Sequence, residues 1–297
     1  MRSEKEMYDL ILGYAKNEDD IRAVILNGSR ANPDRKPDPF NDFDIVYLVR
    51  NVEAYKQKAW NTEYGEKLFG EMLVYERTDE NEIFDEHFPE FICYLMQFAD
   101  GNRIDLSIAD IKNYEGYCFG DGYATVLLDK DNVLPEVPVY DGSGYFIQKP
   151  TEQIFFECRT EFWWVAPYVA KGLWRNQLLY AHAHVGIIRD MLIKMLGWYV
   201  GTEHGFDLSL GKKDDRLQEL LPAELWEGLL STYPHCNEED IWRALFDACA
   251  LFTKVSKLVA ERFGFPIRDE YDRRVTAFLK YTKELPRDAE TIDFSVN

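Results

Sequence analysis

The chain has 297 residues, enough for two domains of ordinary size, and its 46% apolar and 15% aromatic content excludes a disordered protein. No run of about 18 apolar residues predicts a membrane span, and the first residues lack the apolar core of a secretory signal, so we expect a cytoplasmic protein. The formal charge of -19, of which residues 1–148 carry -15, disfavours a nucleic-acid partner and suits a polycationic small molecule, although acidity that serves only solubility explains the charge equally well.

Segments with helical and strand-like patterns alternate in the first half of the chain. Apolar residues at helical spacing predict a helix over 3–17, and the short apolar run over 21–26 predicts a strand that ends before Gly28. Further patterns predict one helix and four strands, in chain order: strand 43–49, helix 53–69, and strands 71–77, 91–98 and 103–109. Asp100-Gly101-Asn102 between the last two strands is typical of a hairpin turn. The pattern predicts an α/β domain with a mixed sheet.

Glycine and proline are frequent over 121–150, which indicates a linker, and we place the domain boundary near 148. Beyond it, long amphipathic segments predict helices over 151–171, 174–198, 214–221, 238–263 and 269–283. The predicted fold class is α+β, with a mixed-sheet domain over 1–148 and an all-α helical bundle over 149–297.

The first apolar run is followed by Gly28-Ser29-Arg30. Glycine allows backbone amides to approach a phosphate closely, while Ser29 adds a hydroxyl donor and Arg30 adds positive charge. By itself, a Gly-Ser pair after a strand is an ordinary turn.

Two aspartates, Asp42 and Asp44, lie at the start of the predicted strand 43–49. Alternate side chains of a strand face the same side, so the two carboxylates are expected on one face, about 7 Å apart. Two adjacent anions suit one or two Mg²⁺ ions, which supply the missing charge and accept oxygen ligands. For an isolated Asp-x-Asp, solvated charges at a strand edge are the better explanation, but the preceding Gly-Ser turn favours a metal and phosphate site.

A third carboxylate, Asp105, lies inside the otherwise apolar strand 103–109. A charge in such a strand usually has a partner or a chemical task. Here the task would be to complete the metal site or to accept a proton from an attacking hydroxyl. The alternative is a salt bridge to Arg103 or a solvent-facing position.

An apolar-Gly-Ser motif, an Asp-x-Asp motif and a lone Asp on a later strand together resemble the polymerase-beta-type nucleotidyltransferase superfamily. Within it, the stretches 27–33, 42–47 and 103–107, with the helical second half, resemble the aminoglycoside 6-adenylyltransferases, which modify streptomycin. The resemblance extends over most of the chain. One departure is the presence of Pro33, Pro37 and Pro39, which indicate an irregular loop after the Gly-Ser turn where many members begin a helix.

The resemblance implies that ATP is the co-substrate, with its triphosphate at Gly28-Ser29 and Mg²⁺ ions between Asp42, Asp44 and the phosphates. A hydroxyl of a streptomycin-type aminoglycoside would attack the α-phosphorus in line and release pyrophosphate, with Asp105 as base or as a further metal ligand. The product would be an inactivated antibiotic. The alternatives are a protein or RNA acceptor, or a non-catalytic nucleotide-binding protein of the same fold; the negative charge disfavours RNA, and the three carboxylates disfavour a non-catalytic protein.

In related enzymes, a lysine from the helical domain helps to bind the triphosphate. Lys212 and Lys213, at the predicted start of a helix, are the candidates in this chain. The alternative is a solvated charged loop that caps the helix.

The predicted helix 151–171 offers a candidate face for the acceptor. Glu157, Glu161 and Trp164 recur at helical spacing, so acidic and aromatic side chains share one side and could bind a cationic sugar. Trp174, near the start of the next helix, is a further candidate. Core packing of the aromatic residues, with exposed glutamates, is the favoured alternative for this face.

Overall fold

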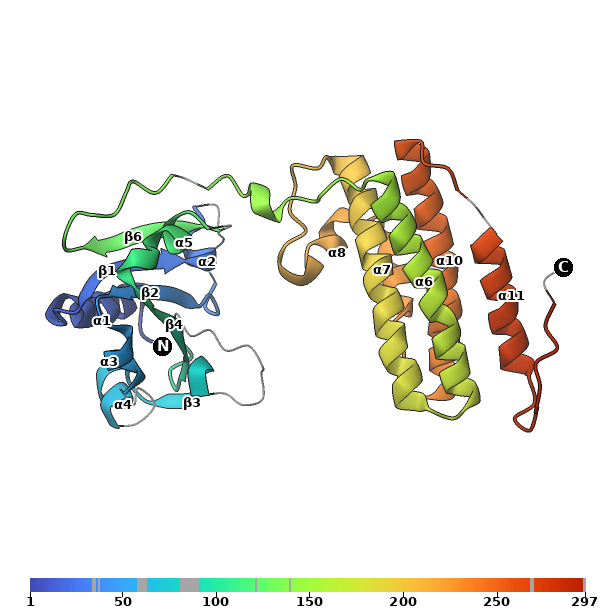
Figure 1. Cartoon of the computed structure of the whole chain (residues 1–297), viewed down its shortest axis with the longest axis horizontal. Coiled ribbons are helices and arrows are strands. Elements are labelled where there is room, and N and C mark those ends of the chain that lie inside the picture. Colours follow the sequence, from blue (N-terminus) through green and yellow to red (C-terminus); the bar gives the residue numbers. More distant parts are fainter. Residues whose placement is uncertain are drawn as a thin grey trace. The chain divides into compact units, whose positions relative to one another are not determined.

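The computed structural model of the chain describes residues 1–33, 36, 38–57, 63–80, 91–120, 122–138, 140–267 and 270–295. By its internal packing the chain divides into two compact units, residues 1–144 and 145–297, so the boundary predicted near 148 lies just inside the second unit. The first unit contains a six-stranded sheet with short helices, and the second is built from helices (Figure 1). The predicted α+β class is confirmed.

The sheet of the first unit has the strand order β3-β4-β5-β2-β1-β6. Strands β2 and β5 run parallel, and the other neighbours run antiparallel. The strands are β1 (Ile21–Asn27), β2 (Phe43–Val49), β3 (Met72–Arg77), β4 (Phe91–Phe98), β5 (Arg103–Asp110) and β6 (Ala124–Asp129). The helices are α1 (Glu4–Asn17), α2 (Gly28–Ala31), α3 (Val52–Lys56), α4 (Glu63–Phe69) and α5 (Tyr114–Cys118).

The predicted elements of this unit are confirmed except in two places. The helix expected over 53–69 is wrong as a single element, because α3 ends at Lys56 and α4 begins at Glu63, with residues 58–62 outside the described residues. The linker expected over 121–150 contains strand β6, which pairs with β1 through contacts such as Leu26 with Thr125. The apolar run of β6 therefore adds a strand in spite of the glycines and prolines around it.

The two faces of the sheet are covered differently. Helices α1, α3 and α4 pack on one face, where the core includes Met7 and Tyr47. The other face carries a smaller apolar core, in which Ile25 and Val46 pack against α5 and the segment 134–137. Because side chains alternate along a strand, Asp44 lies on the same face as Val46. Asp44, a residue of the candidate site, therefore lies on the face of the sheet that carries the smaller core.

In the described residues of the second unit, the α-helices are α6 (Glu152–Trp174), α7 (Leu178–His204), α8 (Leu217–Leu220), α9 (Ala223–Ser231), α10 (Glu238–Phe263) and α11 (Glu270–Glu284). The core lies between the long helices, where the ring of Phe162 on α6 stacks on that of Phe252 on α10 at 3.8 Å. Asn237 begins α10 by accepting the Asp240 backbone N–H, and Gly264 ends it in the left-handed conformation. The predicted helices are present with different bounds: the helix predicted over 174–198 is α7, which begins at Leu178 and ends at His204, so Trp174 is the last residue of α6. Helix α8 is shorter than expected, α9 was not predicted, and residue 269 lies outside the described residues.

A buried ion pair joins α6 to α11 inside the second unit. Arg159 Nη2 donates to Asp272 Oδ1 at 2.6 Å, and the two side chains are only 3% and 9% exposed. Within the described residues, Arg159 Nε and Asp272 Oδ2 have no hydrogen-bond partner. Each charge therefore depends on the other for compensation.

Replacing Asp272 by Ala should lower the free energy of unfolding by about 3–5 kcal/mol, because the Arg159 charge stays buried without its partner. Urea denaturation of the purified protein measures the loss. The matched control is Glu224→Ala, which breaks an exposed pair with Lys254 of the same 2.6 Å length and should cost about 1 kcal/mol or less. Equal losses in the two variants would contradict the prediction.

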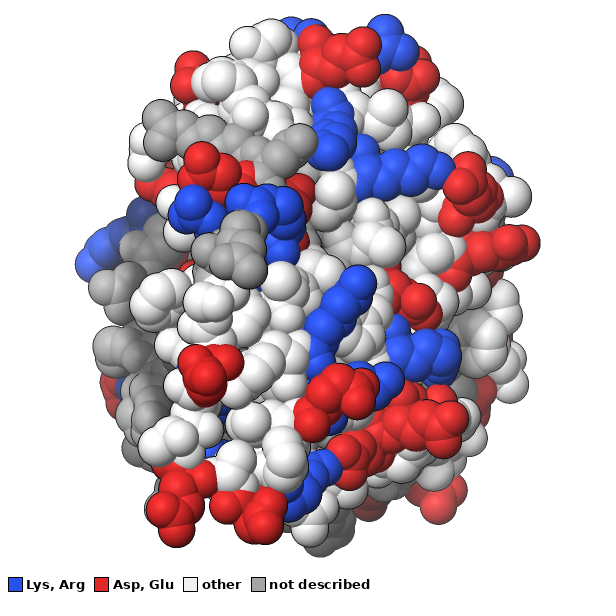
Figure 2. All heavy atoms as spheres, turned by 90° about the vertical axis from the view of Figure 1, so that its right-hand side faces the viewer, with Lys and Arg blue, Asp and Glu red and all other residues white. Residues whose placement is uncertain are grey.

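Figure 2 shows one face of the molecule, on which acidic and basic side chains both occur. On the face in Figure 2, basic side chains are interspersed with acidic ones and do not gather into one patch. None of the helices in the described ranges is long and apolar enough to cross a membrane.

Candidate active site

Strand pairing aligns the polar residues of the candidate site in one row across the sheet. Asn27 of β1 pairs with Asp44 of β2, and Asp44 pairs with Asp105 of β5. Residues in register on neighbouring strands face the same side, about 5 Å apart at their backbones. The fold thus brings together two carboxylates that are 61 positions apart in the sequence.

Arg103 contacts Asp105 of this row and also the third predicted carboxylate, that of Asp42. Its guanidinium forms two hydrogen bonds with Asp105, from Nε to Oδ1 at 2.7 Å and from Nη2 to Oδ2 at 2.9 Å. Its Nε also lies 3.7 Å from Asp42 Oδ2. The hydrogen bond with Asp105 raises the pKa of Arg103, and the charges of Asp42 and Asp44 raise it further. The salt bridge between Arg103 and Asp105, the alternative task for this aspartate, is therefore present, and Asp42 lies within ion-pair distance of the same guanidinium.

The donor chemistry of the row fits a hard divalent cation. Three carboxylates from one end of two neighbouring strands supply the oxygen ligands that Mg²⁺ prefers. Within the described part of the chain, no three Asp, Glu, His or Cys side chains converge as a ready-made metal cluster. Both oxygens of Asp105 instead contact Arg103. The carboxylates of this row are suitable ligands for Mg²⁺. The positive group that contacts them in the structure is the guanidinium of Arg103.

The turn after β1 lies directly against the Asp44 carboxylate. Gly28 has a φ of +68°, in the left-handed region, and a Cβ atom there would collide with the carboxylate, coming within 2.7 Å of its Cγ. Glycine is therefore required both by the backbone conformation and by the close approach. Helix α2 is a single turn that ends before Pro33, in agreement with the irregular loop expected; Pro37 lies outside the described residues. Ser29 is exposed at this turn.

Arg30 is placed differently from the phosphate ligand expected. Its side chain is 7% exposed and lies over the Phe43 ring at 3.7 Å. Nε and Nη2 donate to the carbonyls of Asn41 and Asp42, and Nη1 donates to Glu4 Oε1 at 2.8 Å. The guanidinium therefore fixes the loop that carries Asp42, because each of its nitrogens is bonded within the fold.

Asn27 and Cys93 also belong to this face and were not predicted as site residues. Asn27 Nδ2 donates to the Tyr117 carbonyl at 3.0 Å and to the Tyr123 carbonyl at 3.3 Å, which ties α5 and the start of β6 to the row. Cys93 pairs with Ser107 of β5, and burial raises the pKa of its thiol to about 11. The thiol stays neutral at ordinary pH and does not act as a nucleophile. The cue for Asn27 was its place at the end of an apolar strand.

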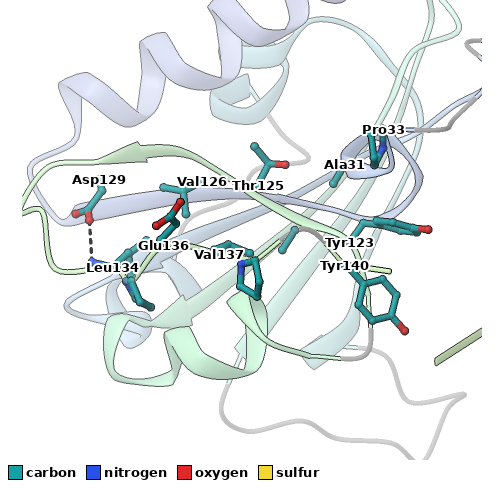
Figure 3. Close-up of a pocket in the computed structure, with 13 residues that line it drawn as sticks. Ala31, Pro33, Tyr123, Thr125, Val126, Asp129, Leu134, Glu136, Val137 and Tyr140 are labelled. Atoms are coloured by element: carbon teal, nitrogen blue, oxygen red, sulfur yellow. Dashed lines mark hydrogen bonds between the residues drawn. The ribbon is translucent and has the colours of Figure 1, made fainter. Parts of the chain in front are cut away.

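A cavity of about 470 Å³ lies beside the Gly28 turn (Figure 3). The described residues that line it are Ala31, Pro33, 123–126, Asp129, 134–138 and Tyr140. The Tyr123 and Tyr140 rings meet edge to face at 5.1 Å. Among the described residues, its lining includes two carboxylates, Asp129 and Glu136, and no Lys or Arg. This composition suits a neutral or cationic ligand and disfavours a triphosphate.

Lys212 and Lys213 are exposed in the second unit, in a turn that follows Gly211. Lys213 and Asp214 have φ values of +59° and +60°, so two successive residues other than glycine adopt the left-handed conformation. Such backbone is strained and is found most often at functional sites. Helix α8 begins only at Leu217, so the lysines precede it by one turn.

The acceptor face predicted on α6 is exposed. Trp164 is 64% exposed, so the core-packing alternative is wrong for this residue. Glu157 and Glu161 line a cavity of about 660 Å³ between α6 and α7, together with Met191 and Lys194. The face therefore combines a hollow, two carboxylates and an exposed indole.

Aromatic rings continue this face along the helix pair. The Tyr168 ring lies 6.4 Å from that of Trp164 and 5.5 Å from that of His184 on α7, which in turn lies 4.1 Å from the ring of Tyr180. Tyr180 and His184 were not identified from the sequence, although their spacing of four residues on a helix is the signal that would have grouped them.

Trp174 does not lie with this group of rings. Its Nε1 donates to the Leu285 carbonyl at 3.1 Å and to the Pro286 carbonyl at 3.2 Å. The indole therefore holds the segment that follows α11, and the structure gives it a packing role in place of the acceptor contact expected.

Comparison with known proteins identifies the family of the chain. The family described as streptomycin adenylyltransferase matches residues 1–282. An aminoglycoside 6-adenylyltransferase of Bacillus subtilis is 38% identical over 285 residues, covering 95% of this chain and 98% of that protein. Proteins of the same description from Campylobacter jejuni and Staphylococcus aureus are 38% and 32% identical, covering 91% and 96% of this chain and 93% and 100% of those proteins.

A crystal structure of an aminoglycoside 6-adenyltransferase from Bacillus subtilis aligns at 34% identity and a TM-score of 0.47, covering 96% of this chain and 100% of that chain. The family match extends over nearly the whole length, and the relatives exceed 30% identity at nearly full coverage. The chain therefore belongs to the streptomycin adenylyltransferase family of nucleotidyltransferase enzymes.

Proposed function

We propose that the protein transfers AMP from ATP to a hydroxyl of a streptomycin-type aminoglycoside, releases pyrophosphate and so inactivates the antibiotic. The observation that carries the proposal is the alignment of Asp44 with Asp105 on parallel neighbouring strands, beside the Gly28 turn. The relatives named as aminoglycoside 6-adenylyltransferases support the choice of acceptor. We also propose a cytoplasmic location, because the proposed reaction requires ATP.

The nucleotide and the acceptor are assigned to different parts of the chain. We propose residues 1–148 as the nucleotidyltransferase domain and residues 149–297 as the helical substrate-binding domain. The triphosphate binds at the Gly28-Ser29 turn, where amides and the exposed Ser29 hydroxyl can donate to phosphate oxygens. Lys212 and Lys213 add positive charge from the second domain. Mg²⁺ held by Asp42, Asp44 and Asp105 would neutralise charge on the attacking and leaving oxygens.

In the transfer step, the acceptor oxygen forms a bond to the α-phosphorus while the bond from that phosphorus to the bridging oxygen of pyrophosphate breaks. Asp105 accepts the proton that the hydroxyl loses. The two hydrogen bonds that Asp105 accepts from Arg103 do not prevent this proton transfer, because a carboxylate has about four lone-pair positions. Asp105 is 21% exposed, so a substrate hydroxyl can reach it.

The acceptor is proposed to bind on the α6 face. Glu157 and Glu161 supply negative charge at the cavity between α6 and α7, and Trp164 supplies an exposed ring for cation-π contact. A streptomycin-type acceptor carries guanidinium groups, which match carboxylates in charge and geometry. The excess of acidic residues in the whole chain favours the same class of ligand.

The direct test is incubation with Mg²⁺, labelled ATP and one acceptor at a time: streptomycin, kanamycin, spectinomycin, a tRNA or bulk protein. We expect pyrophosphate release and a labelled product with streptomycin. Asp42→Asn should abolish both, which excludes a contaminating enzyme. Label transferred to tRNA or protein, with streptomycin unmodified, would overturn the proposed acceptor.

Glu161→Gln and Trp164→Ala should each raise the KM for streptomycin by about tenfold, because each removes one charge-assisted or cation-π contact. The KM for ATP should stay unchanged, since neither residue contacts the nucleotide. Steady-state kinetics with each substrate varied in turn separates the two constants. The matched control is Glu261→Gln, an equal change of charge at an exposed position of α10, which should leave both constants unchanged. Equal KM increases for ATP and streptomycin would exclude this face as the acceptor site.

A further inference from the structure

We propose that Arg103 is a positioning residue and resident counter-ion of the carboxylate site. It holds Asp105 in place in the metal-free protein, and it restrains the affinity of the site for divalent cations, so that the ion enters with the nucleotide. The inference rests on the proposed function, because it assigns the carboxylates of that same site to Mg²⁺ and ATP.

The local backbone directs Arg103 onto its neighbour. Arg103 is the first residue of β5, and Asp105 follows two positions later on the same face of the strand. The planar guanidinium matches the carboxylate with two nearly parallel bonds, of 2.7 and 2.9 Å. Such a pair fixes the orientation of the carboxylate as well as its position.

The same guanidinium reaches a second carboxylate, because Nε lies 3.7 Å from Asp42 Oδ2. One permanent positive charge therefore offsets part of the negative charge that Asp42, Asp44 and Asp105 present on this face. Arg30 does not share this role, since its nitrogens donate to backbone carbonyls and to Glu4. Arg103 is also 39% exposed, whereas the Arg30 side chain is 7% exposed.

A fixed cation at this distance has two consequences for ion binding. It repels a divalent ion that approaches the carboxylates alone, and it reduces the repulsion between the carboxylates and a triphosphate. The acidic row can then accept the ion together with the phosphates, whose charge offsets the repulsion from Arg103. Two properties should therefore depend on Arg103: the affinity for a divalent ion without nucleotide, and the turnover that a fixed Asp105 allows.

The test uses Mn²⁺ as the probe, with the full-length protein and no ATP. Electron paramagnetic resonance of free Mn²⁺ gives the dissociation constant, and thermal unfolding in EDTA reports on the fold. Arg103→Gln removes the charge, whereas Arg103→Lys keeps it and loses the planar fork. The matched control is Arg77→Gln, which breaks another two-bond pair between residues i and i+2, with Asp79, at 2.6 and 2.8 Å. Arg77 pairs with Tyr94, so it lies on the opposite face of the sheet.

We expect Arg103→Gln to bind Mn²⁺ about tenfold more tightly than the wild type, because one positive charge a few ångströms from the ion is removed. Arg103→Lys and Arg77→Gln should keep the wild-type affinity. In assays with saturating Mg²⁺ and varied ATP, kcat of both Arg103 variants should fall at least about tenfold, because Asp105 loses its fixed orientation. The KM for ATP should rise at most a few-fold, as expected for the single charge lost in Arg103→Gln.

Unchanged or weaker Mn²⁺ binding in Arg103→Gln, with a folded protein in EDTA, would overturn the counter-ion role and leave the proposed function intact. Tighter binding without a loss of kcat would overturn the positioning role. A large increase in the KM for ATP would instead identify Arg103 as a phosphate ligand. If Mn²⁺ binds neither the wild type nor Arg103→Gln, or if its binding to Arg103→Gln is unaffected by adding Asp44→Asn, the metal step of the proposed function fails, and this inference fails with it.

Discussion

Asp105→Asn is expected to lower turnover by roughly 10²–10⁴-fold, because the amide cannot take a proton from the acceptor hydroxyl. The affinity for ATP should change no more than a few-fold, since the amide keeps the shape of the carboxylate and can still accept a hydrogen bond from Arg103. Steady-state turnover with streptomycin, and calorimetric binding of a non-hydrolysable ATP analogue, measure the two effects separately.

The matched control for this variant is Asp110→Asn, at the other end of the same strand. Asp110 accepts the Lys112 backbone N–H through Oδ1, which asparagine can still do, so activity should stay near that of the wild type. Comparable losses of turnover and nucleotide affinity in Asp105→Asn would indicate that Asp105 acts chiefly as a metal ligand and not as the base.

The strands that position the site were predictable because their patterns are local. The strand 43–49 is apolar apart from Asp44, and the hairpin before Arg103 contains a glycine, Gly101, with a φ of +87°. Strand alternation predicts that Asp42 and Asp44 share a face; in the structure Asp42 lies one residue before β2, with its carboxylate near Arg103. The family resemblance, now confirmed by the relatives, rested on these same residues.

Two elements of the first unit, strand β6 and the helix expected over 53–69, were predicted wrongly from local sequence patterns. The run that forms β6 is short and lies between glycines and prolines, so it was assigned to a linker; its pairing with β1 is a long-range contact that no local pattern contains. The helix predicted over 53–69 shows a continuous helical pattern, yet α3 ends after five residues. Tertiary contacts decide such cases.

The arginines show why the details of the site could not be predicted. Arg30 follows a Gly-Ser turn, so a phosphate role was the natural interpretation, but its guanidinium reaches Asn41 and Asp42, which are 11 and 12 positions away. The pair of Arg103 with Asp105 was considered, whereas the approach of Asp42 to the same guanidinium depends on the parallel pairing of β2 with β5. A long side chain selects its partner only after the strands have assembled.

Gly28→Ala should lower turnover by roughly 100-fold, although it adds only one methyl group. The new Cβ would meet the Asp44 carboxylate, within 2.7 Å of its Cγ, so either Asp44 or the turn must move. A shift of about 1 Å at a residue that handles the reacting phosphate is enough for a loss of this size. The unfolding free energy should fall as well, by about 1–2 kcal/mol for the left-handed conformation.

Gly264→Ala separates displacement of the carboxylate from backbone strain. Gly264 has a φ of +71°, close to the +68° of Gly28, but a Cβ there meets no described atom within 4 Å. Both variants should lose similar stability in urea denaturation, because both place alanine in the left-handed region. Only Gly28→Ala should lose turnover. If Gly264→Ala lost as much activity, the effect would belong to general destabilisation; if Gly28→Ala kept full activity, close contact between the turn and Asp44 would not be needed for the reaction.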